Sequence, residues 1–188
     1  MTDTPDPTRE TERALGRFLI SFSRLEQEIG EAVKVVLKVK EPADLIVAAL
    51  QDFARKANTV KAGVEHAVLP DGKKPSDEWR KNATMAMNRC LAINQEWRVV
   101  VAHASLDIDA DGNLKLRQLK IQDGELKISE TTKTAKDLQD GAGQLDKLAM
   151  RVRDLRTELS TLVFHLEAGT FIAGPPEFGS ATLRITEQ

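Results

Sequence analysis

Four stretches of the chain repeat apolar residues at alternating steps of three and four, which is the spacing of one face of an α-helix. The first runs from Leu15 to Val36 and the second from Ile46 to Ala67. The third runs from Trp79 to Val101 and the fourth from Leu138 to Leu166. In the first stretch, charged residues such as Arg17, Arg24 and Glu31 lie off the apolar stripe. The pattern therefore predicts four amphipathic helices.

Turn residues separate the first three of these helices. Pro42 ends the first and favours the start of the second, because proline is accepted in a first helical turn. Residues 69–75 hold two prolines and a glycine, and this composition is typical of a loop. Ser76 follows as a good N-cap, which predicts that the third helix begins directly after it.

The fourth helix is expected to start near Thr132 or Thr134 and to run to Ala168. Gly141 and Gly143 lie in its first turns, and each weakens a helix by about 1 kcal/mol relative to alanine. A loose or irregular beginning is therefore expected there.

Between the third and fourth helices the apolar period changes from near 3.6 to 2, which is typical of β-strands. Leu106 and Ile108 alternate with charged residues, and residues 110–113 have the composition of a hairpin turn. The alternation later slips by one residue, which predicts a β-bulge near Arg117–Gln118. With a second turn at 122–124, we expect a three-stranded antiparallel meander over about residues 105–129.

These elements predict a mainly α fold. Its expected architecture is an antiparallel four-helix bundle with the small antiparallel meander inserted between the third and fourth long helices. Residues 1–8, which contain two prolines, are expected to form a disordered arm. Residues 9–169 are expected to form a single helical domain, and residues 170–188 a C-terminal tail.

Composition narrows the classes of function. The net charge of −2 argues against a surface that attracts nucleic acid everywhere, so a phosphate site must be local. Cys90 is the single cysteine and falls on an apolar helical position, which predicts a buried, reduced thiol and a cytoplasmic protein. No apolar run approaches the roughly 20 residues of a membrane span, so no membrane association is expected.

The segment that suggests chemistry is Asn94–Ala104, at the end of the third helical pattern. Arg98 and His103 are separated by four residues of this segment. Arginine carries a permanent charge shaped for phosphate, and histidine exchanges a proton near neutral pH. Asn94, one turn before Arg98, can bind phosphate or orient Arg98. The alternatives are that Arg98 and His103 complement the helix dipole, and that Asn94 is an ordinary surface residue.

Geometry links the arginine and the histidine to self-association. A step of five residues on an ideal α-helix turns about 500°, so Arg98 and His103 would point about 140° apart within one chain. A two-fold dimer brings two arginines and two histidines to one cleft. A homodimer is therefore expected.

The chain resembles the HEPN superfamily (higher eukaryote and prokaryote nucleotide-binding domain). The resemblance depends on Arg98-Val-Val-Val-Ala-His103, the preceding Cys90–Trp97 segment and the amphipathic helix around Phe22–Glu26. It implies a metal-independent endoribonuclease of a toxin or defence system, with Arg98 and His103 as catalytic residues and no cofactor. It also implies a homodimer, RNA as substrate and an antitoxin or other protein as partner. Val99 departs from the family, whose active members commonly carry a polar residue after the arginine.

The alternative is a non-catalytic dimeric helical module that binds RNA, nucleotide or a protein partner, which Val99 and the mildly acidic charge favour. His66 and His165 are expected to be structural, and they have no cysteine or carboxylate spacing for zinc, so no metal site is expected. Basic residues of the meander alternate with acidic ones, which favours a solvated ribbon over an RNA-binding surface. These basic residues are Lys115, Arg117, Lys120 and Lys127.

Overall fold

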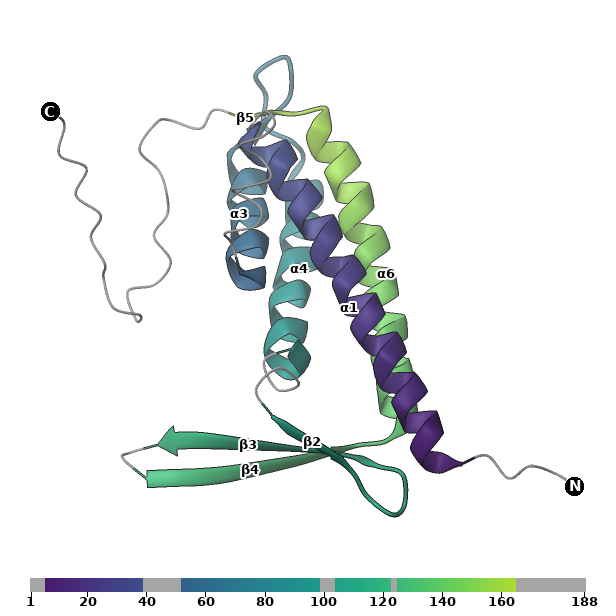
Figure 1. Cartoon of the computed structure of the whole chain (residues 1–188). Helices are drawn as coiled ribbons and strands as arrows, with labels where there is room; N and C mark the ends of the chain where they lie inside the picture. Colours follow the sequence, from purple (N-terminus) through teal and green to yellow (C-terminus); the bar gives the residue numbers. More distant parts are fainter. Residues whose placement is uncertain (1–5, 39–51, 99–103, 123–124, 165–188) are drawn as a thin grey trace, which may run out of the picture.

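The computed structural model describes residues 6–38, 52–98, 104–122 and 125–164. This part of the chain contains four α-helices and a three-stranded antiparallel sheet that lies between the third and the fourth in sequence (Figure 1). The predicted fold class is therefore confirmed. The helices are α1 (Pro7–Leu37), α3 (Phe53–His66), α4 (Asp77–Ile93) and α6 (Ala135–Ser160).

Helix α1 begins at Pro7, inside the stretch that was predicted to be disordered. The Oδ1 atom of Asp6 accepts a hydrogen bond from the backbone N–H of Thr8 at 3.1 Å, and Pro7 occupies the first turn. An N-cap followed by proline is a strong helix start. The prediction was therefore wrong for residues 7 and 8, and residues 1–5 lie outside the described part.

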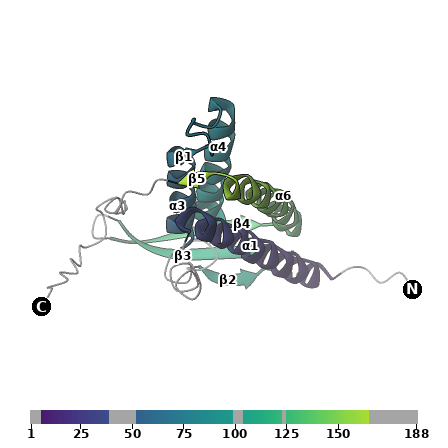
Figure 2. The same ribbon diagram turned by 90° about the horizontal axis from the view of Figure 1, so that it is seen from above.

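Helices α1 and α6 pack side by side over most of their length (Figures 1 and 2). Contacts between the described helices show that α1, α3 and α6 are parallel to one another and that α4 is antiparallel to them. The contacts that establish these directions are Arg17–Asp146 and Glu28–Arg153 for α1 and α6, Phe22–Phe53 and Glu26–Lys56 for α1 and α3, and Trp79–Glu158 and Arg89–Gln144 for α4 and α6.

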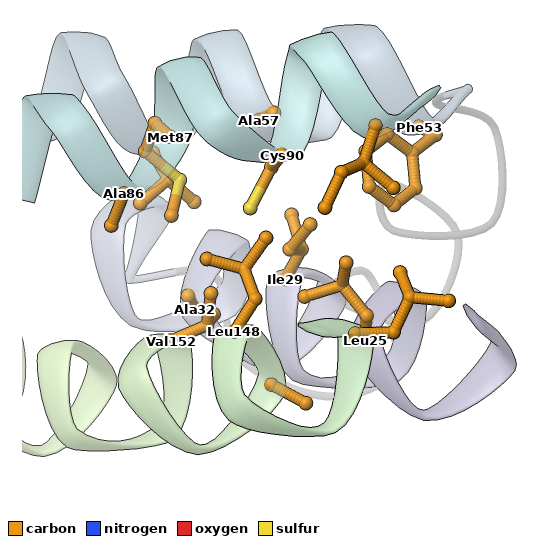
Figure 3. Close-up of a cluster of buried hydrophobic side chains, with 14 of the residues drawn as sticks. Leu25, Ile29, Ala32, Phe53, Ala57, Ala86, Met87, Cys90, Leu148 and Val152 are labelled. Carbon is orange, nitrogen blue, oxygen red and sulfur yellow. The ribbon is translucent and has the colours of Figure 1, made fainter. Parts of the chain in front are cut away.

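The core fills the space between the four helices with aliphatic side chains and few aromatic ones (Figure 3). Phe53 of α3 is fully buried and lies against Phe22 of α1, with 5.0 Å between the ring centroids. Of the residues labelled in Figure 3, Leu25, Ile29 and Ala32 come from α1, Ala86, Met87 and Cys90 from α4, and Leu148 and Val152 from α6. No described helix has the length and apolar character needed to cross a membrane.

The sheet lies across the end of the bundle at which α4 ends and α6 begins (Figure 1). Its strands are β2 (Ser105–Ile108), β3 (Leu114–Gln122) and β4 (Glu125–Lys133), in that spatial order. The meander was predicted at this position, but its third strand continues to Lys133 rather than ending near residue 129.

The predicted bulge in this sheet is wrong. Strands β3 and β4 pair without interruption from Leu114↔Lys133 to Gln122↔Glu125. Leu114 and Leu116 face the bundle and are each 1% exposed, whereas Leu119 and its partner Ile128 point to the other face and are 68% and 70% exposed. The shift in the apolar alternation therefore does not reflect a bulge. It arises because Leu119 and Ile128 form an apolar pair on the outer face of the sheet.

Two contacts at the ends of the bundle were not predicted. Near the sheet, the turn between β2 and β3 packs against the start of α1, where the hydroxyl of Thr11 donates to the carbonyl of Gly112. At the other end, β1 (Ala67–Val68) pairs antiparallel with β5 (Val163–Phe164). Strand β1 directly follows the end of α3. Strand β5 begins at Val163, three residues after α6 ends at Ser160, so α6 ends before the apolar pattern predicts.

Candidate functional site

The segment that contains Arg98 and His103 follows α4 in the sequence. The start of α4 is held against α6 by a hydrogen bond. The Oγ atom of Ser76 accepts from the backbone N–H of Trp79 at 3.2 Å, which confirms the predicted N-cap. The indole Nε1 of Trp79 donates to Oε2 of Glu158 at 2.8 Å. This contact sets the position of α4 along α6 and so of the segment at its other end.

The α-helical hydrogen-bond pattern of α4 stops where this segment begins. It ends at Ile93, and Asn94–Arg98 forms a π-helical turn, η1. In a π-helix the hydrogen bonds run from residue i to i+5 instead of i+4, and such turns are frequent at functional sites. The ideal α-helical angle between Arg98 and His103 therefore does not apply to a step that starts in this turn.

Trp97 anchors the π-turn to three other elements. Its ring lies 4.7 Å from the ring of Phe18 in α1, centroid to centroid. The ammonium of Lys133, at the end of β4, lies 4.5 Å from the centroid of the same indole, which is within cation–π range. In α6, a Cβ built on Gly141 would lie 3.5 Å from Cζ2 of Trp97 and 3.1 Å from Cε2 of Phe18. The residue before Arg98 is thus held at the junction of bundle and sheet.

Gly141 has the opposite role to the one predicted for it. The described α6 is regular from Ala135, and its N-cap Thr134 forms a capping box with Asp137. The missing side chain at Gly141 leaves room for the rings of Phe18 and Trp97. The helix therefore tolerates the glycine, and a side chain at this position would crowd the ring of Phe18.

Asn94 is buried, with 7% of its surface exposed, and its Oδ1 atom has no hydrogen-bond partner in the described part of the chain. Its interpretation as an ordinary surface residue was therefore wrong. An unpaired buried amide oxygen costs free energy, so such an atom in a native protein calls for an explanation.

The structure locates only part of the predicted site. Arg98 is the last residue of η1, and His103 lies outside the described residues together with Val99. Asn94, Trp97 and Arg98 share one turn. The separation of Arg98 and His103, and their relation to a second copy, stay predictions.

The remaining candidate residues differ in their surroundings. Cys90 is fully buried, as predicted, and burial raises the pKa of its thiol to about 12, so it stays protonated. His66 is exposed in the last turn of α3, and His165 is outside the described part. Among the described residues, no group of His, Cys, Asp or Glu side chains has the arrangement of a metal site.

Two basic side chains of the sheet are paired with acidic ones. Nε of Arg117 lies 2.7 Å from Oε2 of Glu130 on the neighbouring strand, and Nζ of Lys115 lies 3.7 Å from Oδ2 of Asp109. These pairs are consistent with the solvated ribbon predicted from the alternation of charge.

A group of basic residues close to the π-turn was not predicted from the sequence. Arg89 of α4 lies opposite Lys147 and Arg151 of α6 across a groove. The spacing of Lys147 and Arg151 places them on one helix face, and this signal was available in the sequence. Their position opposite Arg89 depends on how α4 packs against α6, which no local pattern reveals.

Comparisons with known protein families, with curated proteins and with solved structures found no match for this chain. Its function is therefore argued from its own residues and contacts.

Proposed function

We propose that the protein is a HEPN-like, metal-independent endoribonuclease of a toxin or defence system that works as a homodimer. The observation that carries the proposal is the π-turn at Asn94–Arg98, because it follows α4 directly and contains the motif arginine. Such turns are rare in proteins as a whole, but those that occur are often found at functional sites. The anchoring of Trp97 from three sides supports it further, since a catalytic group needs a rigid support.

In the proposed reaction the 2′-oxygen of a ribose attacks the adjacent phosphorus, and the bond from phosphorus to the 5′-oxygen breaks. His103 of one protomer takes the 2′-hydroxyl proton, and the same residue of the second protomer gives a proton to the leaving oxygen. Arg98 holds the phosphate and offsets the negative charge of the transition state. The products are a 2′,3′-cyclic phosphate and a 5′-hydroxyl, and none of these steps requires a metal.

Asn94 acts in this proposal as a positioning residue. An amide that is only 7% exposed is poorly accessible to a phosphate in solvent, so its burial favours the second of its two predicted roles. The Oδ1 atom of Asn94 has no hydrogen-bond partner within the described residues, so it can still accept a hydrogen bond.

A non-catalytic dimeric module that binds RNA, nucleotide or a protein partner is the second candidate. The outer face of the sheet favours it, because Leu119 and Ile128 are paired there and more than two thirds exposed. Exposed apolar patches often mark interaction sites. Val99 favours the same candidate, because active HEPN-like proteins commonly carry a polar residue there.

Incubation of the purified protein with mixed RNA, in the presence of a metal chelator, tests the proposal. We expect cleavage to products with 2′,3′-cyclic phosphate ends, reduced about 100-fold or more in Arg98→Ala and His103→Ala. His66→Ala is the matched control, because this histidine is exposed at the end of α3. Absence of cleavage by the parent protein supports the module instead. A strict monomer in light scattering contradicts the shared cleft.

A further inference from the structure

A groove of about 280 Å³ runs between α4 and α6. Its floor is apolar, because Ile93 and Leu148 are 3% and 9% exposed. Three of its lining side chains are cationic and none is acidic. The lining residues are Arg89, Ile93, Gln144, Lys147, Leu148 and Arg151.

Neighbouring side chains orient the two arginines without closing the groove. Nη2 of Arg89 donates to Oε1 of Gln144 at 2.8 Å, and its Nη1 lies 3.8 Å from Oε1 of Glu96. Nη1 of Arg151 lies 3.6 Å from Oε1 of Glu158. Both glutamates lie outside the lining. The ammonium of Lys147 has no ion-pair partner within the described ranges, so the groove keeps a net positive charge.

A second basic groove, of about 540 Å³, lies between α1 and α6 and contains three arginines. The carboxylate of Asp146 is part of its lining and lies 3.8 Å from Nη2 of Arg17, so an entering anion would meet a negative charge inside the groove. The groove between α4 and α6 has no acidic lining residue.

The groove between α4 and α6 also leads toward the π-turn. Ile93, in its floor, directly precedes Asn94, and the ion pair of Arg89 with Glu96 joins the groove to η1. Lys147 and Arg151 are one helical turn apart, about 6 Å along α6. Arg89, Lys147 and Arg151 thus form a series of cations along the groove.

We propose that this groove binds the phosphate groups of an RNA backbone through Arg89, Lys147 and Arg151. This inference rests on the proposed function, for which it supplies the contacts that position the substrate. Cations that neutralise phosphates bind without regard to sequence, and the bound strand is held in register by them. The apolar floor accommodates the sugar edges between phosphates.

The test uses a fluorescent 2′-O-methyl RNA of about 20 nucleotides and mixed sequence, which has the phosphates but no nucleophilic 2′-hydroxyl. Binding to the full chain is measured by anisotropy between about 50 and 200 mM salt. Each phosphate contact contributes about −0.7 to the slope of log K against log salt, so the parent should give about −2. Lys147→Gln should weaken binding about fivefold near 0.1 M salt and reduce the slope by about 0.7. The double variant with Arg151→Gln should lose about 25-fold.

Lys81→Gln is the matched control, because Lys81 is exposed on α4 outside the groove. It should leave affinity and slope unchanged, and circular dichroism confirms that the variants are folded. Equal affinity and slope in the groove variants and Lys81→Gln would overturn the inference, as would absence of binding by the parent. Competition by inorganic pyrophosphate as strong as that by unlabelled RNA would assign the site to small phosphates and overturn the RNA assignment.

The uncleavable probe separates this inference from the proposed function. If the groove variants bind weakly but the parent does not cleave ordinary RNA, the groove assignment stands and the ribonuclease proposal fails. If the parent cleaves RNA and the groove variants bind normally, the groove assignment alone fails.

Discussion

The indole of Trp97 and the ring of Phe18 lie 4.7 Å apart, centroid to centroid, with their planes tilted by 37°. This contact joins the π-turn at the end of α4 to α1, which is far away in the sequence. Because Lys133 and Gly141 border the same indole, Trp97 connects the bundle, the sheet and the candidate site.

Replacement of Trp97 by alanine should therefore destabilise the whole fold. We expect a loss of about 3 kcal/mol in the free energy of unfolding, because the substitution leaves a cavity and removes the aromatic and cation–π contacts. Trp97→Phe should recover part of the loss, since it keeps the ring contact. Met85→Ala is a suitable control, because Met85 is 58% exposed on α4 and should change stability by less than about 0.5 kcal/mol. Urea unfolding measures all three, and a loss in Trp97→Ala as small as that of the control contradicts the role of the junction.

Gly141 and Gly143 of α6 provide a matched pair for the same junction. An added Cβ at Gly143 meets no atom within 4 Å, so Gly143→Ala should stabilise the protein by up to about 1 kcal/mol through helix propensity. At Gly141 the added Cβ would lie 3.1 Å from Cε2 and 3.3 Å from Cδ2 of Phe18. Overpacking should offset the propensity gain and leave Gly141→Ala about 2 kcal/mol less stable than Gly143→Ala. Thermal unfolding distinguishes the two, and equal stabilisation of both would show that the rings move aside without cost.

The contact between the sheet and α1 can be tested at Gly112 with Gly72 as the control. Both glycines have positive φ, 80° and 82°, so alanine costs about 1 kcal/mol in backbone strain at either position. Gly72 has open space around it, whereas a Cβ on Gly112 would lie 2.6 Å from Cβ of Pro7 and 2.9 Å from its backbone carbon. Gly112→Ala should therefore be the more destabilising by about 1 to 3 kcal/mol in chemical denaturation. Similar losses in both variants would argue against a fixed contact between the turn and α1.

The capping box of α6 should give stability that depends on pH. Hydrogen bonds from the backbone and the hydroxyl of Thr134 lower the pKa of Asp137 below its ordinary value of 3.8. Because this pKa is lower in the folded state, the stabilisation is fully present above 3.8 and is lost as the pH falls through the folded pKa. Thr134→Ala should cost about 1 kcal/mol near neutral pH.

Urea unfolding of the parent and Asp137→Asn at a series of pH values measures this linkage. The difference between them should be constant near neutral pH and shrink below pH 3.8. A difference that does not change as the pH falls would show that the Asp137 carboxylate does not stabilise the cap.

The spacing of apolar residues, together with capping and turn residues, was sufficient to predict most of the secondary structure. Steps of three and four placed apolar stripes where α1, α3, α4 and α6 are found, because the period of a helix is the same in any fold. Ser76 was identified as a cap because its role depends only on the next three residues. The change to a period of two located the sheet, and positive φ at Gly112 matches the predicted turn.

Tertiary structure decided where these elements end, which residues are buried and what the site contains. Pairing of β1 with β5 ends α6 before Leu166, although the apolar stripe continues, because strand partners distant in the sequence compete with local helix propensity. Leu119 is exposed and Asn94 buried for a related reason: their burial depends on which face meets another element. The groove cations come from two helices, so their convergence appears only when α4 packs against α6. Local residue patterns therefore define the helices and strands, whereas contacts between distant segments define how their side chains meet.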